Sequence, residues 1–270
     1  MSNPVRSYYD QLDAGEWLRL DTALGRIELE TTLALVNQYF PATGRICDIG
    51  AGPGRYSIEL LSRGYNVTLF ELSPVLLERA KSEIAQAGLE AEALILGRAP
   101  DLSNLPESAF DAALVMGPQY HLVDSSDRHK TLMELRRILK PNAVAIVAYL
   151  NTLGIIRAAI THFPERLGDI SVLRNMLKES KYGADLEGFT ESYWATPCSA
   201  VAEIQSAGFE IITYASPESF AAGMGKALEE IKQNYPSAYE NIVSVAVETA
   251  EHPAFRDTGE HIHFVVRLNP

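Results

Sequence analysis

The chain has 270 residues, enough for one large domain or a domain with an insertion, and its content of 47% hydrophobic and 21% charged residues is ordinary for a globular protein. Its formal net charge of −12 argues against nucleic acid as a partner, because nucleic-acid binding depends mainly on Lys and Arg contacts to phosphates. No stretch approaches the roughly 20 apolar residues that span a membrane, and the amino end lacks an apolar signal core, so we expect a cytoplasmic protein with a small-molecule partner.

The first 44 residues carry no strand pattern, and we expect them to form a helical cap segment ahead of the core. A helix is predicted over about 27–39, ended by Pro41. Tyr8, Tyr9 and Arg19 precede it. These side chains either contribute to a binding site or lie on an amphipathic helix at the sheet edge, with Arg19 in solvent.

Apolar runs alternate with helical patterns over residues 45–150, which is typical of βαβ units and a parallel sheet. The apolar runs predict strands near 45–49, 66–71, 93–97, 110–116 and 143–150. Helices are predicted between them over about 55–63, 74–87 and 126–139. We therefore expect an α/β fold whose core lies within these residues.

The alternation stops after the fifth predicted strand. Residues 151–194 show a helical pattern without a strong strand, which predicts a helical insertion above the fifth strand. The α/β pattern resumes over 195–270 and completes the core. It predicts a helix over 199–207, a strand over 209–214, helical stretches over 218–234 and 237–250, and a last strand over 261–267.

A glycine-rich loop follows the first predicted strand. Gly50, Gly52 and Gly54 alternate with other residues, Asp48 stands two residues earlier, and Glu71 ends the second strand. Glycines at alternate positions let the backbone turn sharply and approach a ligand closely, because no Cβ stands in the way. An acidic side chain at the end of the next strand can accept hydrogen bonds from ribose hydroxyls. Together they predict a nucleoside site, although Glu71 alone could instead cap the following helix.

The spacing G-x-G-x-G, with Asp48 before it, resembles the first motif of class I S-adenosylmethionine-dependent methyltransferases. A dinucleotide fingerprint reads G-x-G-x-x-G, with the third glycine inside the helix. Residues 110–115 and 135–142 are similar to the family's fourth strand and to the helix and turn before its fifth. The family has glycine where this chain has Asn142, which can also adopt a left-handed backbone.

The resemblance implies a doubly wound, mostly parallel, seven-stranded Rossmann-like sheet whose antiparallel last strand inserts between the fifth and sixth. It also implies S-adenosylmethionine as methyl donor and a small-molecule acceptor methylated at O, N or C. Residues 45–150 would bind the donor, and residues 151–194 would form a lid over the acceptor. The donor-binding residues implied are Tyr8, Tyr9, Arg19, Asp48, Gly50, Ala51, Gly52, Gly54, Glu71, Leu72, Arg98, Ala99 and Met116.

One position departs from the family pattern. After the third strand the family commonly carries Asp-Ala, with the Asp accepting from the adenine amino group, whereas this chain has Arg98 and Ala99. Because an arginine cannot accept a hydrogen bond, adenine would be held by backbone groups, by stacking, or by a carboxylate such as Asp101. Arg98 either covers the purine through a cation–π contact or faces solvent.

The loop after the fourth strand offers candidate catalytic residues. Ligands of doubly wound sheets bind outside the carboxyl ends of the strands, where Tyr120 and His121 are expected. A histidine with an ordinary pKa near 6.5 suits a general base, although it could equally hydrogen-bond a neighbouring backbone group.

No metal site is predicted. His162, His261 and His263 show no metal-ligand spacing with acidic or Cys partners, and the alternation of His261 and His263 indicates one face of a strand. Two other functions stay open beside methyl transfer. A nicotinamide-dependent oxidoreductase could use the same sheet, and a non-catalytic S-adenosylmethionine-binding protein could carry the same motifs.

Overall fold

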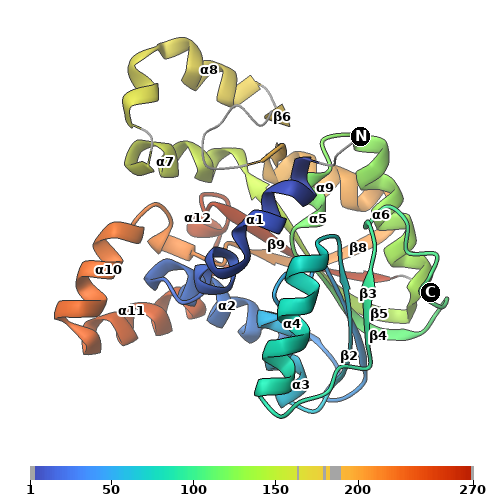
Figure 1. The fold of residues 1–270 in the computed structure, drawn as a ribbon. Coiled ribbons are helices and arrows are strands. Elements are labelled where there is room, and N and C mark those ends of the chain that lie inside the picture. The colour runs from blue at the N-terminus through green and yellow to red at the C-terminus, as the bar shows by residue number, and fades with distance from the viewer. Residues whose placement is uncertain (1–3, 163, 179–180, 183–189, 269–270) are drawn as a thin grey trace.

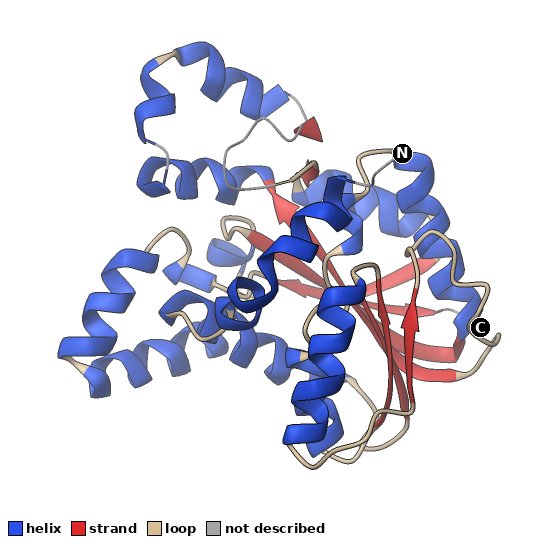
Figure 2. Ribbon diagram, viewed as in Figure 1, coloured by secondary structure: helices blue, strands red, loops and turns tan. Residues whose placement is uncertain are grey.

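The computed structural model describes residues 4–162, 164–178, 181–182 and 190–268. The fold is α/β, with a central β-sheet and helices on both of its faces (Figures 1 and 2). The seven main strands lie in the order β3-β2-β1-β4-β5-β9-β8. The strands are β1 (Arg45–Ile49), β2 (Asn66–Glu71), β3 (Ala93–Leu96), β4 (Phe110–Val115), β5 (Leu139–Asn151), β6 (Lys181–Tyr182), β7 (Ser192–Ala195), β8 (Phe209–Ala215) and β9 (His261–Leu268).

The strand directions confirm the predicted fold class. Strands β1 to β5 pair in parallel, and β9 lies antiparallel between β5 and β8. The carboxyl ends of β1, β2, β4 and β5 therefore meet at one edge of the sheet, next to the start of β9. A doubly wound sheet binds its ligands at this edge.

Several helices begin at a side-chain cap. Thr22, for example, accepts a hydrogen bond from the backbone N–H of Gly25 and caps α2. The helices are α1 (Pro4–Arg19), α2 (Ala23–Tyr39), α3 (Arg55–Ser62), α4 (Pro74–Gln86), α5 (Pro118–His121), α6 (Ser125–Ile138), α7 (Thr152–His162), η1 (Pro164–Gly168), α8 (Ile170–Lys178), α9 (Pro197–Ser206), η2 (Ser219–Ala221), α10 (Gly225–Asn234), α11 (Pro236–Thr249) and α12 (Pro253–Arg256).

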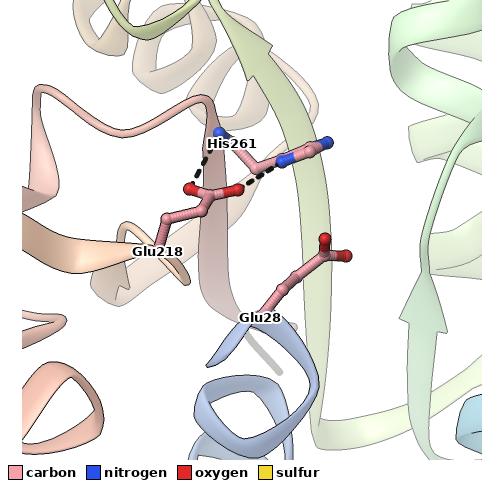
Figure 3. A group of neighbouring side chains, drawn as sticks. All are labelled: Glu28, Glu218 and His261. Atoms are coloured by element: carbon pink, nitrogen blue, oxygen red, sulfur yellow. Dashed lines mark hydrogen bonds and ion pairs between the residues drawn. The ribbon is translucent and has the colours of Figure 1, made fainter. Parts of the chain in front are cut away.

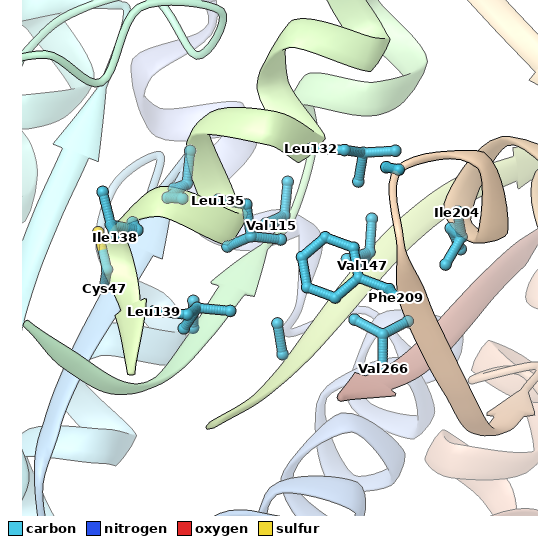
Figure 4. Close-up of a cluster of buried hydrophobic side chains, with 14 of the residues drawn as sticks. Cys47, Val115, Leu132, Leu135, Ile138, Leu139, Val147, Ile204, Phe209 and Val266 are labelled. Carbon is cyan, nitrogen blue, oxygen red and sulfur yellow. The ribbon is translucent and has the colours of Figure 1, made fainter. Parts of the chain in front are cut away.

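The core lies on both faces of the sheet. Leu132, Leu135 and Ile138 of α6 and Ile204 of α9 pack with Phe209 and the strands on one face (Figure 4). Apolar side chains of α2, α3 and α4 cover the other face. Helices α10 and α11 pack on α2 in a separate apolar cluster, and α1 packs on α4. This places α1 and α2 beside the ligand-binding edge.

The insertion differs from the prediction. Helices α7 and α8 form as expected, but the segment also contains β6 and β7, where no strand was predicted. Strand β7 has only four residues and all of them are buried, so it shows no alternation of apolar and polar residues. The predicted helix over 218–234 is broken before α10, because Gly223 adopts a left-handed φ of 76°. Asn142 has the expected left-handed backbone, with φ 65°.

Candidate functional site

A cavity of about 390 Å³ opens at the carboxyl edge of the sheet, between the strand ends and helices α1 and α2. Most of the site residues predicted from the sequence line it, namely Tyr9, Arg19, Gly50, Ala51, Gly52, Glu71, Leu72, Arg98, Ala99, Met116, Tyr120 and His121. Tyr8, Asp48 and Gly54 are not among its lining residues. A cavity of this size suits a nucleoside-sized ligand.

Gly52 is the glycine that leaves room for a ligand. A Cβ at Gly50 would lie 2.6 Å from Pro118, and one at Gly54 would lie 3.0 Å from Ala80, so these glycines allow close packing within the protein. A Cβ at Gly52 would meet nothing within 4 Å and would enter the cavity. Its φ of +54° also favours glycine.

Glu71 is buried beside this glycine. Its two carboxylate oxygens accept the backbone N–H groups of Gly52 at 2.9 Å and of Ser73 at 2.8 Å. Burial raises the pKa of the carboxyl, and the backbone hydrogen bonds oppose that shift. Each oxygen keeps a further lone pair, so the carboxylate can accept hydroxyl groups of a ligand while it shapes the glycine loop.

Asp48 lies behind the loop rather than in the cavity. Ser57 donates to its Oδ2 at 2.6 Å, whereas Oδ1 is buried without a hydrogen-bond partner among the described residues. Burial raises the pKa of Asp48 to about 7. The predicted role in donor binding would therefore be indirect, through the position of the loop.

The raised pKa of Asp48 predicts a pH-dependent stability. The folded protein keeps this proton up to about pH 7, whereas the unfolded chain releases it near the ordinary pKa of 3.8. The free energy of unfolding should therefore fall as the pH rises through this range, by at most about 1.4 kcal/mol per pH unit. Asp48→Asn should lack this decline in urea unfolding at several pH values. Glu59→Gln, on the exposed side of α3, controls for loss of one charge, and equal slopes in wild type and Asp48→Asn would contradict the prediction.

Arg98 lies at the rim of the cavity. It donates to Asp127 of α6 at 2.5 Å, and both side chains line the cavity. Asp101 is not among the lining residues, and its Oδ1 accepts the backbone N–H of Ser103 instead. The structure thus brings a different carboxylate, Asp127, to this wall. A cation–π contact between Arg98 and adenine stays a prediction.

Arg19 lines the cavity from α1, and its side chain is 38% exposed, so it contributes to the cavity wall while it stays partly in solvent. Its Nε donates to Glu16 at 2.9 Å, and its terminal nitrogens donate to both oxygens of Glu28 at 2.6 and 3.2 Å. Burial alone would raise the pKa of Glu28, but the charge and hydrogen bonds of Arg19, together with His261 and His263, lower it to about 2. Three of the five N–H donors of a guanidinium are thus used within the protein.

His121 is partly buried between α1 and the segment before β7. Its Nε2 lies 2.7 Å from the hydroxyl of Tyr9, and its Nδ1 lies 3.3 Å from the carbonyl oxygen of Glu191. A carbonyl oxygen only accepts, so the proton belongs on Nδ1, and Tyr9 donates to Nε2. Burial lowers the pKa of His121 to about 4, not the ordinary 6.5 expected from the sequence.

Several cavity residues were not predicted as site residues. Glu28, His261 and His263 line the wall beside β9, and Glu218 holds His261 at 2.5 Å. Glu28, Glu218 and His261 place three potential ligand atoms within 4.8 Å of one another. Sequence spacing could not find this group, because α2, η2 and β9 bring it together. The only local signal for this wall of the cavity was the alternation of His261 and His263 in the sequence.

Part of the core is similar to a known protein family. Residues 46–142 match the family model of a methyltransferase domain. An uncharacterised methyltransferase of Mycobacterium tuberculosis is 30% identical over 100 residues, which is 37% of this chain and 37% of that protein. The chain therefore spans little more than a third of the length of this curated relative.

The fold is also similar to solved structures over most of the chain. A methyltransferase dependent on S-adenosylmethionine from Methanosarcina mazei has a TM-score of 0.60 at 18% identity, covering 87% of this chain and 97% of that one. One from Mesorhizobium loti has a TM-score of 0.58 at 17% identity, covering 88% and 97%. At such identities this likeness concerns the fold.

Proposed function

We propose that the chain, whose residues 46–142 match the family model of a methyltransferase domain, transfers the methyl group of S-adenosylmethionine to a small-molecule acceptor at O, N or C. The observation that carries this proposal is the open space at Gly52 beside the buried carboxylate of Glu71. The donor supplies a methyl group already activated on a sulfonium. The protein then has to align the acceptor and exclude water.

The donor-binding roles follow the positions of the side chains. Gly52 leaves room for the nucleoside, and Glu71 accepts its ribose hydroxyls. Leu72, Ala99 and Met116 supply apolar contacts along the cavity. Tyr9 and Arg19 approach from α1, where the remaining N–H groups of Arg19 suit a carboxylate of the donor.

On the acceptor side we assign Tyr120 and His121. Both line the cavity on α5, and their rings lie 4.8 Å apart between centroids. Tyr9 and His121 both line the cavity and are hydrogen-bonded to each other, so a proton that leaves the acceptor can pass to Tyr9 as Tyr9 gives its own proton to His121 Nε2. Glu191 lines the same wall, which supports the insertion as an acceptor lid.

Glu71→Ala should weaken binding of S-adenosylhomocysteine by about 1.5–3 kcal/mol, the value of hydrogen bonds to a charged group. Glu71→Gln keeps one acceptor oxygen, so its affinity should lie between those of Glu71→Ala and wild type. Calorimetry measures both affinities. The assignment of Glu71 to the ribose fails if the alanine variant is folded and binds as tightly as wild type.

Two other functions make different predictions. An oxidoreductase would bind NADH more tightly than S-adenosylmethionine in the same calorimeter. A non-catalytic binding protein would bind the donor yet form no S-adenosylhomocysteine with any acceptor in a screen of hydroxyl, amine and carbon nucleophiles.

None of the described helices is long and apolar enough to cross a membrane. A cytoplasmic location stays a prediction.

A further inference from the structure

His261 and His263 lie on one face of β9 and line the cavity. In the sheet order β9 is four strands away from β2, the strand that ends at Glu71. The proposed roles in donor binding and proton transfer use neither of them. One ring nitrogen of each histidine is hydrogen-bonded to a buried polar side chain. The other ring nitrogen of each can therefore contact a ligand.

The carboxylate of Glu218 fixes His261 (Figure 3). Glu218 is buried, and its Oε1 lies 2.5 Å from Nδ1 of His261, while its Oε2 accepts the backbone N–H of His261 at 3.2 Å. Figure 3 shows the second ring nitrogen pointing away from this carboxylate. That Nε2 has no hydrogen-bond partner among the residues the structure describes. Burial alone would lower the pKa of His261, but the carboxylate of Glu218 raises it to about 9. Nε2 therefore carries a proton at neutral pH.

His263 has the opposite character. Its Nδ1 lies 3.1 Å from Oγ1 of Thr32, and Thr32 donates its own proton to the carbonyl oxygen of Glu28. The hydroxyl must therefore accept from Nδ1, which leaves a lone pair on Nε2. His263 is only 1% exposed, and burial lowers its pKa to about 4, so the ring is neutral. Within the described part of the chain, Nε2 has no hydrogen-bond partner.

A divalent metal ion fits this wall poorly. Glu28, Glu218 and His261 have metal-ligating atoms close together, but the two carboxylates are already paired with cationic side chains of the protein. Both oxygens of Glu28 accept from Arg19, and Glu218 holds the protonated Nδ1 of His261. A metal ion would have to displace a guanidinium and a proton. The carboxylates instead compensate the charges of Arg19 and His261.

We propose that His261 and His263 form the acceptor-binding subsite, for a neutral molecule that carries a carbonyl oxygen beside an N–H or O–H group. His261 donates to the carbonyl oxygen, and His263 accepts from the neighbouring N–H or O–H. The ring centroids lie 6.3 Å apart, so one such group can bridge them. The acceptor is neutral because the nearby cations and carboxylates are paired with each other.

Tyr120 connects this subsite to the proposed chemistry. Its ring centroid lies 6.0 Å from that of His261 and 4.8 Å from that of His121. A molecule held by the two histidines of β9 would therefore lie across Tyr120, with its nucleophile toward His121. This inference rests on the proposed methyl transfer for the direction in which the acceptor faces.

Benzamide is a suitable probe, because it is neutral and offers a carbonyl oxygen beside N–H groups. We expect it to bind the protein saturated with S-adenosylhomocysteine, and more tightly than benzoate or benzylamine. In His261→Asn and His263→Asn the asparagine amide can keep the bond made by Nδ1 while Nε2 is lost. Each variant should lower the affinity for benzamide at least about 10-fold, which corresponds to the loss of one hydrogen bond. The affinity for S-adenosylhomocysteine should stay within about 2-fold of the wild-type value. His129→Asn, on the exposed side of α6, should change neither affinity.

The outcomes separate this subsite from the proposed function. Failure of S-adenosylhomocysteine to bind wild type would reject the methyltransferase proposal itself. If it binds, and benzamide either does not saturate or binds the two asparagine variants like wild type, the subsite is rejected alone. A rise in melting temperature with Mn²⁺ or Zn²⁺ that His261→Asn abolishes would replace the subsite by a metal site.

Discussion

Gly52→Val is expected to reduce the affinity for S-adenosylhomocysteine at least about 100-fold, equivalent to about 2.8 kcal/mol. The added side chain would enter the open part of the cavity, where no protein atom lies within 4 Å of the new Cβ. The strand before the loop is untouched, so the fold should survive. Calorimetry on the folded variant gives the affinity.

The strain of a branched residue at positive φ needs its own control. Gly64 also has a left-handed backbone, with φ +86°, and a Cβ there would also meet nothing within 4 Å. Because it lies at the end of α3 and outside the cavity lining, Gly64→Val should lose stability without losing donor affinity. Wild-type affinity in a folded Gly52→Val protein would remove this loop from the donor site.

His121→Ala is expected to lower the single-turnover methylation rate by roughly 10²–10⁴, the usual contribution of a positioned base. Donor affinity should barely change, because proton transfer is needed only as the acceptor reacts. Since burial holds the pKa of His121 near 4, the wild-type rate should not rise through a histidine pKa near 6.5. Rapid-quench measurements with an acceptor from the turnover screen test both statements.

Tyr9→Phe should reproduce much of this loss, because it removes the hydroxyl that lies 2.7 Å from Nε2 of His121. His129→Ala, on the exposed side of α6, should react like wild type. An acceptor that is already a free nucleophile needs no base. A near-normal rate for His121→Ala with saturating donor would therefore make His121 a residue that positions Tyr9.

The parts of the site that were predictable have local signals. Gly52 and Glu71 stand at the ends of two neighbouring apolar runs, so periodicity and spacing alone placed them together. The contacts that change the chemistry are not local. His121 is partly buried by Tyr9 and the segment before β7, which the sequence does not place beside it, and an ordinary pKa was therefore the wrong expectation.

The same reason explains the missed wall of the cavity. Glu218 and His261 are 43 positions apart, and Thr32 and His263 are 231 apart. Only the packing of α2 and η2 against β9 brings these pairs together. The strand β7 was missed because it has only four residues, all buried, which is too few to form a pattern.

The position of β9 has a consequence for folding. This strand is made after the others, yet it lies between β5 and β8, so until it is in place both of those strands present open edges. Open edges favour aggregation, and pairing partners more than 100 residues apart in sequence fold slowly. During synthesis on the ribosome, the cavity wall that carries His261 and His263 would thus be completed last. A chaperone that shields the edges of β5 and β8 during that interval would raise the yield of folded protein.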